Sequence, residues 1–342
     1  MSDFDFKNSS YQCYIVRDFL STLFFNKRIP LVIVGGSDVD AVRRKLLDTY
    51  GNVKVTLVGK DERSCKVQNI DGDYDKIIID AIPLIEAERF DFADFVQIMK
   101  RLRADDGCEW DRAQTHESIR INLIEEAYEL LEAIDAKDND MMKEECGDVL
   151  MQAIFHTEIA EKEGDFDYCD MLTALCRKLI DRHTHIFGTN HANTPEEALA
   201  FWNEAKKKEK KYSSYADAMD KVPKNLPSLL YAEKLQKRAK KSGFDWPSVD
   251  GALEKVVEEL EELKSATPEN RVEEAGDLLF AVVNVLRFYK IDPEMALHDA
   301  SIKFFRRFEI VERLANERGI DMPSTSIDEL DKLWEEAKRL LK

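Results

Sequence analysis

The sequence predicts a mainly α-helical protein, with two tandem all-α helical bundle domains preceded by a small α/β unit. The chain combines 44% hydrophobic with 35% charged residues and has only 13 glycines and 9 prolines in 342 residues, which favours helices. Apolar residues recur at helical spacing from Phe90 onward, and one pattern of acidic residues occurs twice. We therefore expect an α/β unit over 1–88 and helical domains over 89–212 and 213–342.

The first 88 residues contain the predicted strands. The apolar runs 29–34 and 53–58 are typical of buried strands, residues 38–50 form a helical pattern, and 76–79 is a third strand candidate. Gly35-Gly36-Ser37 follows the first strand. These residues form either a phosphate loop or an ordinary turn, and we favour the turn because the G-x-G-x-x-G pattern and a lysine are both missing.

Helical spacing dominates after Phe90. Phe92, Phe95, Val96 and Met99 share one face of a predicted helix. Two further stripes contain Leu123, Ala127, Leu130, Leu131 and Ile134, and Val149, Ala153 and Ile154. The lysine-rich run 206–211 indicates a solvated helix end and a linker, with a nucleic-acid-binding tail as the alternative. Prolines 223 and 227 interrupt the pattern before the second domain.

The repeated acidic pattern is the main functional signal. Its first copy has Glu125-Glu126, Glu129, Glu145 and Asp148, and its second copy has Glu258-Glu259, Glu262, Glu274 and Asp277. Acids three residues apart lie on one helix face, so two antiparallel helices would bring four carboxylates together. At about 5 Å and an effective dielectric near 20, each pair repels by about 3 kcal/mol. A divalent cation would remove this repulsion, and oxygen ligands suit Mg²⁺, with Mn²⁺ as a second possibility.

An acidic composition alone also produces such runs on solvated helix faces, because 68 residues are Asp or Glu. The similarity of the two halves extends beyond the acids, however, and includes all four tryptophans. The matching positions are Cys146-Gly147-Asp148 and Ala275-Gly276-Asp277, Lys178/Arg182 and Lys303/Arg307, Trp202/Lys206 and Trp334/Lys338, and 107–110 and 243–246. A tandem repeat explains this order better than chance.

The overall charge excludes several function classes. Fifty basic and 68 acidic residues give a net charge of −18, which argues against binding to nucleic acid or to an anionic membrane. The acidic start M-S-D-F-D-F differs from a signal peptide, and no apolar run approaches about 20 residues. The six cysteines form no C-x-x-C motif. We expect reduced thiols and a cytoplasmic location.

These motifs resemble the MazG family of nucleoside triphosphate pyrophosphohydrolases. The resemblance covers Phe90 to Lys342 as two tandem MazG domains, and it rests on W110-D111-x-x-Q114-T115 together with the ordered acidic, Lys/Arg and Trp/Lys motifs. Glu109 departs from the family, which usually has proline there. Residues 29–34, 55–58 and 73–75 resemble the second half of a tetrapyrrole-methylase domain. The first half of that domain, with its methyl-donor loop, has no counterpart, so we expect this unit to be non-catalytic.

The resemblance implies cleavage of a (d)NTP between its α- and β-phosphates. In the second copy it implies Mg²⁺ ligands at Glu259, Glu262, Glu274 and Asp277, with Glu258 orienting the water or a ligand. It implies substrate contacts from Lys303, Arg307, Trp334 and Lys338. The first-copy counterparts are the metal ligands Glu126, Glu129, Glu145 and Asp148 and the substrate-binding residues Lys178, Arg182, Trp202 and Lys206.

The resemblance also implies that the second copy is the principal catalyst and that the chain forms a homodimer, although the two copies could pair within one chain. For Trp202 and Trp334, packing in a helical core is the alternative to substrate stacking. His183 and His185 are two residues apart, so they point to different helix faces, and we interpret them as structural.

Two other functions remain open. A regulatory helical-repeat protein with vestigial metal sites would have lost members of the acidic sets, and neither copy has done so. A different metal-dependent phosphohydrolase would place His-Asp pairs among its ligands, and the sequence has no such pair at ligand spacing. We therefore favour a Mg²⁺-dependent pyrophosphohydrolase that cleans the nucleotide pool.

Overall fold

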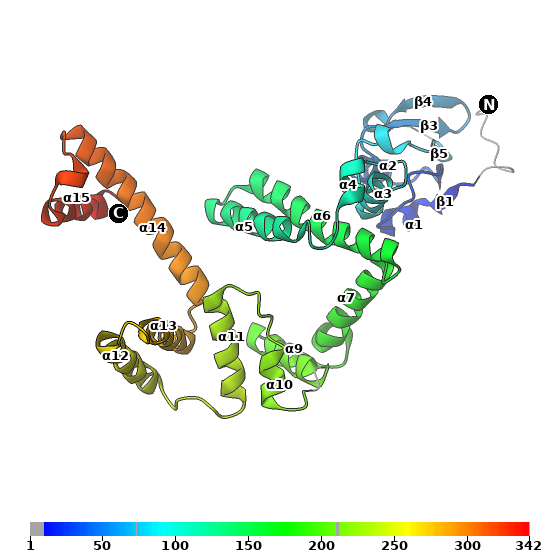
Figure 1. Cartoon of the computed structure of the whole chain (residues 1–342). Coiled ribbons are helices and arrows are strands. Elements are labelled where there is room, and N and C mark those ends of the chain that lie inside the picture. The colour runs from blue at the N-terminus through cyan, green and yellow to red at the C-terminus, as the bar shows by residue number, and fades with distance from the viewer. Residues whose placement is uncertain (1–9, 73, 210–211, 342) are drawn as a thin grey trace. The chain divides into compact units, whose positions relative to one another are not determined.

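The computed structural model describes residues 10–72, 74–209 and 212–341. The chain divides into two compact units, Met1–Thr189 and Asn190–Lys342. Asp73 of the methylase-like motif, Lys210 and Lys211 of the lysine-rich run and the M-S-D-F-D-F start lie outside the described residues. The prediction of a mainly α-helical chain with a small α/β unit is confirmed, because strands occur only up to Ile79 in the described ranges (Figure 1).

A five-stranded sheet organises the N-terminal part of the first unit. Its order is β1-β2-β5-β3-β4, with β1 parallel to β2 and the other neighbours antiparallel. The strands are β1 (Gln12–Ile15), β2 (Leu31–Val34), β3 (Lys54–Val58), β4 (Glu62–Lys66) and β5 (Lys76–Ile79). The three central strands confirm the predicted runs 29–34, 53–58 and 76–79.

The core of this unit lies between the sheet and two helices, α1 (Val16–Ser21) and α2 (Val39–Tyr50). Alternate strand residues such as Leu31 and Ile33 face the helices and pack with Phe19 and Leu46, as the two-residue period of a strand requires. All four side chains are fully buried. The short helices η1 (Val67–Asn69) and η2 (Leu84–Glu86) complete the connections.

Packing explains the two glycines after β2. Gly35 has a φ of 111°, and a Cβ atom added to Gly36 would lie 2.3 Å from the carbonyl oxygen of Tyr74. Glycine is favoured at position 35 by the positive φ, and at position 36 because no side chain fits where the two backbone segments approach closely. The structure therefore gives Gly35 and Gly36 the turn role that we favoured over a phosphate loop.

A buried ion pair attaches the following helix, α3 (Phe92–Leu102), to the α/β part. Lys27 and Asp94 are each only 3% exposed, and Lys27 Nζ lies 2.8 Å from Asp94 Oδ2. Arg28 also donates to Asp94. Burial raises the pKa of the Asp94 carboxyl, but the hydrogen bonds from Lys27 and Arg28 outweigh burial and lower the pKa below its ordinary value.

The rest of the first unit is helical. It contains α4 (Glu109–Ala113), α5 (Arg120–Ala136), α6 (Asn139–Glu163), α7 (Tyr168–Arg182) and α8 (Thr184–Phe187). Helices α5 and α6 pack side by side as a hairpin (Figure 1). Met99 of α3 packs against Ile154, Phe155 and Ile159 of α6, and this cluster confirms the predicted apolar face of α3.

The second unit consists of helices alone in its described residues. They are α9 (Pro195–Glu209), α10 (Tyr215–Asp220), α11 (Ser228–Lys241), α12 (Val249–Ser265), α13 (Arg271–Phe288), α14 (Pro293–Glu317), η3 (Met322–Ser324) and α15 (Ile327–Leu340). Helix α12 packs along α13, and α14 packs along α15. Val311, Leu314 and Leu333 form the small core between α14 and α15.

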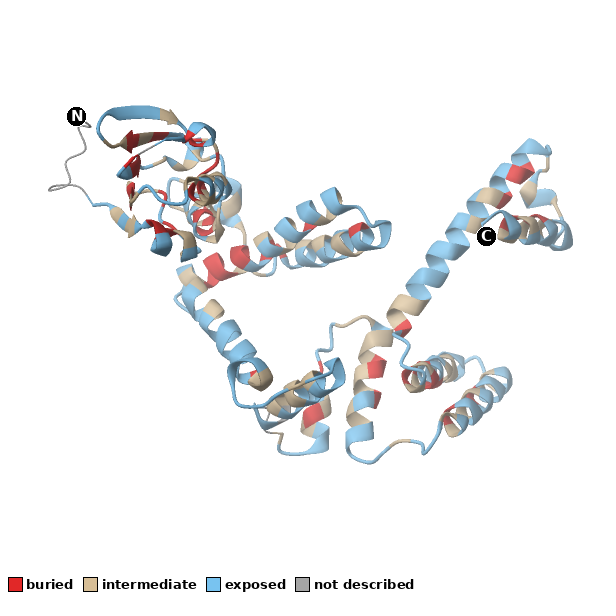
Figure 2. Ribbon diagram, turned by 180° about the vertical axis from the view of Figure 1, so that it is seen from behind, coloured by how far each residue is buried: buried red, intermediate tan, exposed pale blue. Residues whose placement is uncertain are grey.

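Burial differs sharply between the sheet and the helix pairs. Buried residues concentrate in the α/β part, whereas the helix pairs are mostly exposed (Figure 2). The predicted apolar stripe on α5 is only partly covered, since Leu123 and Ile134 remain exposed. Each hairpin, described by itself, therefore leaves part of its apolar side uncovered. Within the described ranges, no helix combines the length and the apolar content needed to cross a bilayer.

We predict that Asp94→Ala destabilises the first unit by about 3–5 kcal/mol, because it leaves Lys27 buried without its partner. Since the folded pKa of Asp94 is depressed, its stabilising effect is present above the unfolded pKa near 4 and is lost as pH falls through the folded pKa. Chemical denaturation at pH 7 and at pH 3 measures both effects. Asp106→Ala is the matched control, because Asp106 pairs with Arg101 of α3 on the exposed surface. Equal losses for the two variants would contradict the prediction.

Candidate metal and active site

A tight turn between α5 and α6 creates the first acidic site. Lys137 ends α5 in the left-handed conformation with a φ of 55°, and its N–H donates to the carbonyl of Ile134. The Asp138 side chain then accepts hydrogen bonds from the backbone N–H groups of Asp140 and Met141 and begins α6. This short connection makes the two helices antiparallel neighbours. The turn therefore determines which acidic residues of α5 and α6 face each other.

The first helix pair brings three predicted ligands together. Carboxylate oxygens of Glu126, Glu129 and Glu145 all lie within 4.8 Å of one another. The fourth predicted ligand, Asp148, is close enough for its charge to raise the pKa values of Glu126 and Glu145, after burial as the larger cause. The spacing Glu-x-x-Glu and Glu-x-x-Asp thus brings three of the four predicted ligands to within ligand distance of one another, with Asp148 nearby.

The second helix pair also brings three predicted ligands together, although they are not the same three positions of the motif. Carboxylate oxygens of Glu259, Glu274 and Asp277 lie within 4.8 Å of one another at the α12–α13 interface. Burial, followed by the charge of Glu259, raises the pKa of the neighbouring Glu262, and Glu274 adds to the shift. Raised carboxyl pKa values mean that each cluster opposes folding increasingly as pH rises through those values. Clustered charge of this kind is unfavourable unless a cation balances it.

Both clusters contain a buried oxygen that lacks a hydrogen-bond partner among the described residues. These atoms are Oε2 of Glu145 in the first cluster and Oε2 of Glu259 in the second. A buried, unsatisfied carboxylate oxygen is costly, and a divalent cation is a partner that would satisfy it. The donor set consists of oxygen atoms alone, which fits Mg²⁺ or Mn²⁺. The residues at both sites therefore fit the predicted ion.

Lys255 distinguishes the second cluster from the first, and the sequence reasoning did not identify it. Its Nζ lies 2.8 Å from Glu258 and 2.7 Å from Glu259, and these hydrogen bonds raise the lysine pKa. The first copy has Asn122 at the matching position. There, Gln152 donates instead to Glu126 over 3.4 Å. The available sequence signal was a lysine four residues before Glu259, but Lys–Glu pairs at this spacing are common on solvated helices.

The predicted phosphate and base contacts lie on other helices than the acids. Lys303 and Arg307 belong to α14, and Trp334 and Lys338 belong to α15. Arg307 lies with its guanidinium carbon 5.8 Å from the centre of the Trp334 ring, and Lys338 pairs with Glu335. The structure brings this set together within the α14–α15 pair, where Trp334 also packs against the small core.

The first-copy set is spread over two helices. Lys178 and the buried Arg182 lie on α7, outside the α5–α6 hairpin. Trp202 and Lys206 lie on α9 of the second unit, with the lysine Nζ 4.6 Å from the centre of the indole ring. The roles assigned to both substrate-binding sets stay predictions.

Comparison with known proteins identifies the family. A model of the MazG nucleotide pyrophosphohydrolase domain matches residues 114–187, which include α5 to α7. A MazG nucleoside triphosphate pyrophosphohydrolase/pyrophosphatase of Thermotoga maritima is 46% identical over 250 residues, which covers 72% of this chain and 95% of the relative. The chain belongs to the MazG family of nucleotide pyrophosphohydrolases, which are hydrolases.

Two further relatives show how far the similarity extends. The nucleoside triphosphate pyrophosphohydrolase of Escherichia coli K12 is 39% identical over 249 residues, which covers 71% of this chain and 95% of the relative. The uncharacterized protein YabN of Bacillus subtilis is 43% identical over 314 residues, which covers 86% of this chain and 63% of YabN. Residues 89–342 make up only 254 of 342 residues, or 74%, so the match to YabN includes part of 1–88.

The family match falls on the first copy of the motif. The second copy has the same ordered acids and also clusters three of them, yet its identity as a second MazG domain stays a prediction, as do the domain boundaries at 88 and 212. The resemblance of residues 1–88 to half of a methylase domain also stays a prediction.

Proposed function

We propose that the chain is a divalent-cation-dependent enzyme that hydrolyses (d)NTPs to (d)NMPs and pyrophosphate. The T. maritima and E. coli relatives are named as nucleoside triphosphate pyrophosphohydrolases. The observation that carries the proposal is the pair of acidic clusters, each of which holds a buried carboxylate oxygen without a partner. Mg²⁺ is the proposed cofactor, with Mn²⁺ as a substitute.

The proposed role of the acidic residues is to bind the metal ions and so to position the substrate. In the second site, Glu259, Glu262, Glu274 and Asp277 would hold the cations, and Glu258 would orient the attacking water. The bound cations would supply charge neutralisation at the phosphates and activation of water. Phosphoryl-type transfer depends on positioning and charge stabilisation, so the chain needs no side-chain nucleophile.

Lys255 gives the second site an internal counter-charge. Its ammonium group pairs with Glu258 and Glu259, next to the place where cations would bind. A cation bound by Glu259 would compete with this ion pair, and the released ammonium group could then contact a phosphate oxygen. Lys303, Arg307 and Lys338 are the further cations proposed for the triphosphate, with Trp334 against the base or sugar. Lys178, Arg182, Trp202 and Lys206 would take these roles in the first copy.

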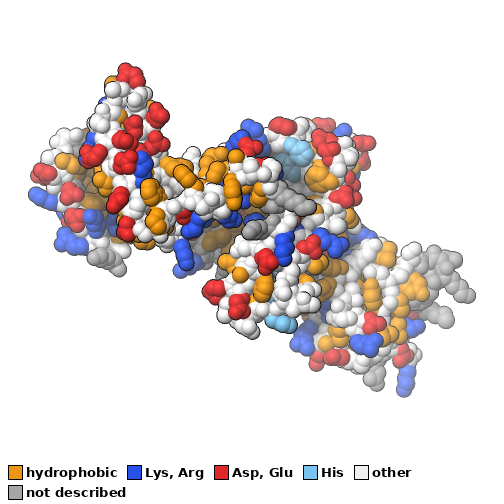
Figure 3. Space-filling view, turned by 90° about the horizontal axis from the view of Figure 1, so that it is seen from below, with side chains coloured by type: hydrophobic (Ala, Val, Ile, Leu, Met, Phe, Trp, Pro, Cys, Tyr) orange, Lys and Arg blue, Asp and Glu red, His pale blue; other side chains and the backbone are white. Residues whose placement is uncertain are grey.

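Exposed apolar side chains support a homodimer. Ile124 and Tyr128 on α5, and Val257 and Leu279 on α12 and α13, are each at least half exposed. Figure 3 shows hydrophobic side chains at the surface among charged ones. Exposed apolar side chains on the acidic hairpins favour an interface, and a second copy of the chain would cover them. The proposed biological setting is removal of unwanted nucleotides in the cytoplasm.

We expect the purified chain with Mg²⁺ to convert NTPs to NMP and pyrophosphate, because the family cleaves nucleotides at the pyrophosphate bond. Anion-exchange chromatography of early time points identifies the first products. Chelation with EDTA should stop turnover, and Mg²⁺ or Mn²⁺ should restore it. Formation of NDP and orthophosphate would overturn the assigned reaction.

The two copies are expected to differ in activity. Glu262→Gln or Asp277→Asn should lower kcat by at least about 100-fold, because each removes a metal ligand from the main site. Glu129→Gln, the matched substitution in the first copy, should lower kcat only a few-fold. Steady-state kinetics of the three variants measures the difference. Equal losses would defeat the assignment of the main site to the second copy.

Sedimentation velocity should show a species of about 79 kDa, twice the 39.5 kDa mass of the chain. Val257→Asp, which places a charge on an exposed apolar position of α12, should shift the equilibrium toward monomer. Lys264→Asp, on the same helix at an exposed polar position, serves as the control. A wild-type protein that sediments as a monomer at micromolar concentration would exclude the dimer.

A further inference from the structure

Two histidines from separate segments of the first unit meet at the end of the α5–α6 hairpin that is opposite to its turn. His116 precedes α5, and His156 lies in the second half of α6. Their Nδ1 atoms are 2.8 Å apart. His156 follows Asp148 by eight residues, which is about 12 Å along the helix axis, so the histidine pair is separate from the acidic cluster.

The two imidazole rings direct these nitrogens at each other. The ring planes are within 9° of parallel, and the ring centres are 5.1 Å apart. This separation exceeds the Nδ1–Nδ1 distance by the width of a ring, so both nitrogens lie between the ring centres and the rings lie edge to edge. The lone-pair directions of the two nitrogens therefore converge on the space between them.

The spacing of the nitrogens is close to that of two imidazole ligands on one metal ion. Zn–N bonds of about 2.0–2.1 Å at the tetrahedral angle place two nitrogens about 3.3 Å apart, so an opening of about half an ångström would admit the ion. In the neutral pair one ring donates from Nδ1 and the other accepts. Binding of an ion by both Nδ1 atoms would move the donated proton to Nε2 of the same ring, so no proton is lost.

A carboxylate lies at the other nitrogen of the His116 ring. Glu163 Oε2 is 3.8 Å from His116 Nε2, whereas Nδ1 of the same ring faces His156. Metal-binding histidines almost always donate their second ring N–H to a carboxylate, a carbonyl or water, which orients the ring and makes the ligand more basic. Glu163 is placed for this role, because His116 bound through Nδ1 has its N–H at Nε2.

Both histidines are attached to ordered parts of the first unit. Thr115 and Ser118 enclose His116 in a turn, because the backbone N–H of each donates to the hydroxyl of the other over 2.9 and 3.3 Å. Phe155, next to His156, is buried in the small core between α3 and α6. The two imidazoles themselves are only partly buried, so an ion can reach them from solvent.

The protonation state and the type of donor favour a transition metal. Burial, followed by the charge of His116, lowers the pKa of His156, so this imidazole is neutral at pH 7 and its lone pair is available. Imidazole nitrogens suit Zn²⁺, Ni²⁺ and Cu²⁺, whereas Mg²⁺ prefers oxygen ligands such as those of the acidic clusters. The two kinds of site are therefore selective for different ions.

The second copy lacks this pair. Counted from Asp148 and Asp277, the position of His156 corresponds to Val285, which is buried. Helices α12 and α13 contain no histidine in their sequences. The histidine pair thus belongs to the first repeat and is not part of the ligand set that both repeats share.

We infer that His116 and His156 bind one Zn²⁺ ion through their Nδ1 atoms, with Glu163 as the carboxylate behind His116 and water in the remaining coordination positions. The ion would join the turn before α5 to α6 and so stabilise the first unit. This site goes beyond the proposed NTP hydrolysis and does not depend on it.

Calorimetry of the full chain measures Zn²⁺ binding, in millimolar Mg²⁺ so that the carboxylates are occupied. His116→Gln and His156→Gln should each weaken one Zn²⁺ site by at least about tenfold, because each removes a metal ligand, and Glu163→Gln should weaken it by a smaller factor. The exposed His191→Gln is the matched control and should bind Zn²⁺ as the wild type does. The six cysteines are the same in every variant, so the difference reports the histidines.

Thermal unfolding provides a second measurement. Because the ion binds the folded chain, saturating Zn²⁺ should raise the Tm of the wild type and of His191→Gln by several degrees. The same addition should leave the Tm of His116→Gln and His156→Gln unchanged. Circular dichroism without Zn²⁺ establishes that each variant is folded before the comparison is made.

Three results would overturn the Zn²⁺ site. The first is equal Zn²⁺ affinity in the wild type and in His116→Gln. The second is an equal loss of affinity in His191→Gln, because the binding would then be nonspecific. The third is a wild-type Tm that depends on pH but not on Zn²⁺, because the two rings would then only share a proton. NTP turnover is not a readout in either measurement, so failure of the proposed function leaves the test of this site intact.

Discussion

Helix packing holds several carboxylates close together, and the repulsion between them is the constraint on which the rest of this structure depends. The turn at Lys137 and Asp138 makes α5 and α6 neighbours, and the α12–α13 pair does the same in the second unit. The acids then meet because Glu-x-x-Glu and Glu-x-x-Asp each occupy one helix face. The apolar packing of each hairpin must exceed this repulsion, and a bound cation would convert the same groups into a source of stability.

Each acidic cluster lies between two packed helices, but the two clusters differ in which motif positions meet and in their surroundings. The first has the neutral Gln152 beside Glu126, and the second has the cationic Lys255 beside Glu259. The unsatisfied oxygen belongs to a ligand of the second helix in the first cluster, Glu145, and to a ligand of the first helix in the second cluster, Glu259. The two repeats have therefore diverged in charge balance, while the order and type of the acids in the sequence motif are the same.

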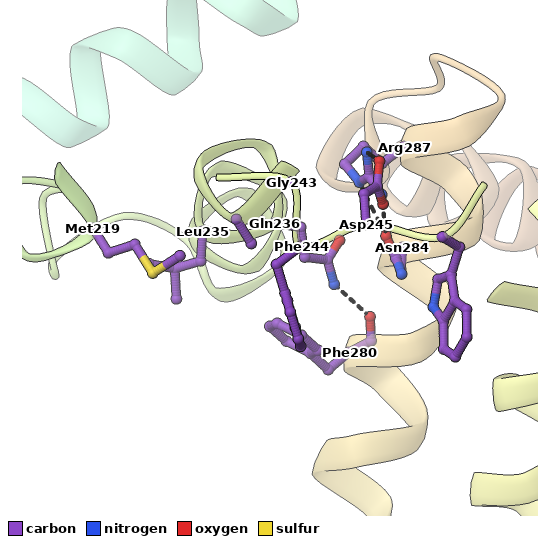
Figure 4. A pocket seen from close by; sticks show the side chains of 11 residues that line it. Met219, Leu235, Gln236, Gly243, Phe244, Asp245, Phe280, Asn284 and Arg287 are labelled. Carbon is purple, nitrogen blue, oxygen red and sulfur yellow. Dashed lines mark hydrogen bonds and ion pairs between the residues drawn. The ribbon is translucent and has the colours of Figure 1, made fainter. Parts of the chain in front are cut away.

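Local periodicity predicted most of the fold. The central strands were predictable because their apolar runs are buried, whereas β4, Glu62–Lys66, is a mainly polar edge strand with no such pattern. The acids were predictable because their spacing is local to each helix. Lys255 was missed because its spacing from Glu259 is ordinary for a solvated ion pair. The cavity lined by Gln236, Phe244 and Asn284 (Figure 4) was missed because these residues come from separate segments that meet only after packing. Pairing of the exposed helix faces was expected only from the family resemblance.

Gly251 controls the shape of a cavity in the second unit without taking part in its polar contacts. Trp246 and Phe280 line this cavity, and a Cβ atom added to Gly251 would lie 2.8 Å from the Trp246 ring. A methyl group at this position would therefore push the indole aside and reshape the cavity wall. Added bulk next to the backbone would thus change this part of the fold while the carboxylates of the acidic cluster stay as they are.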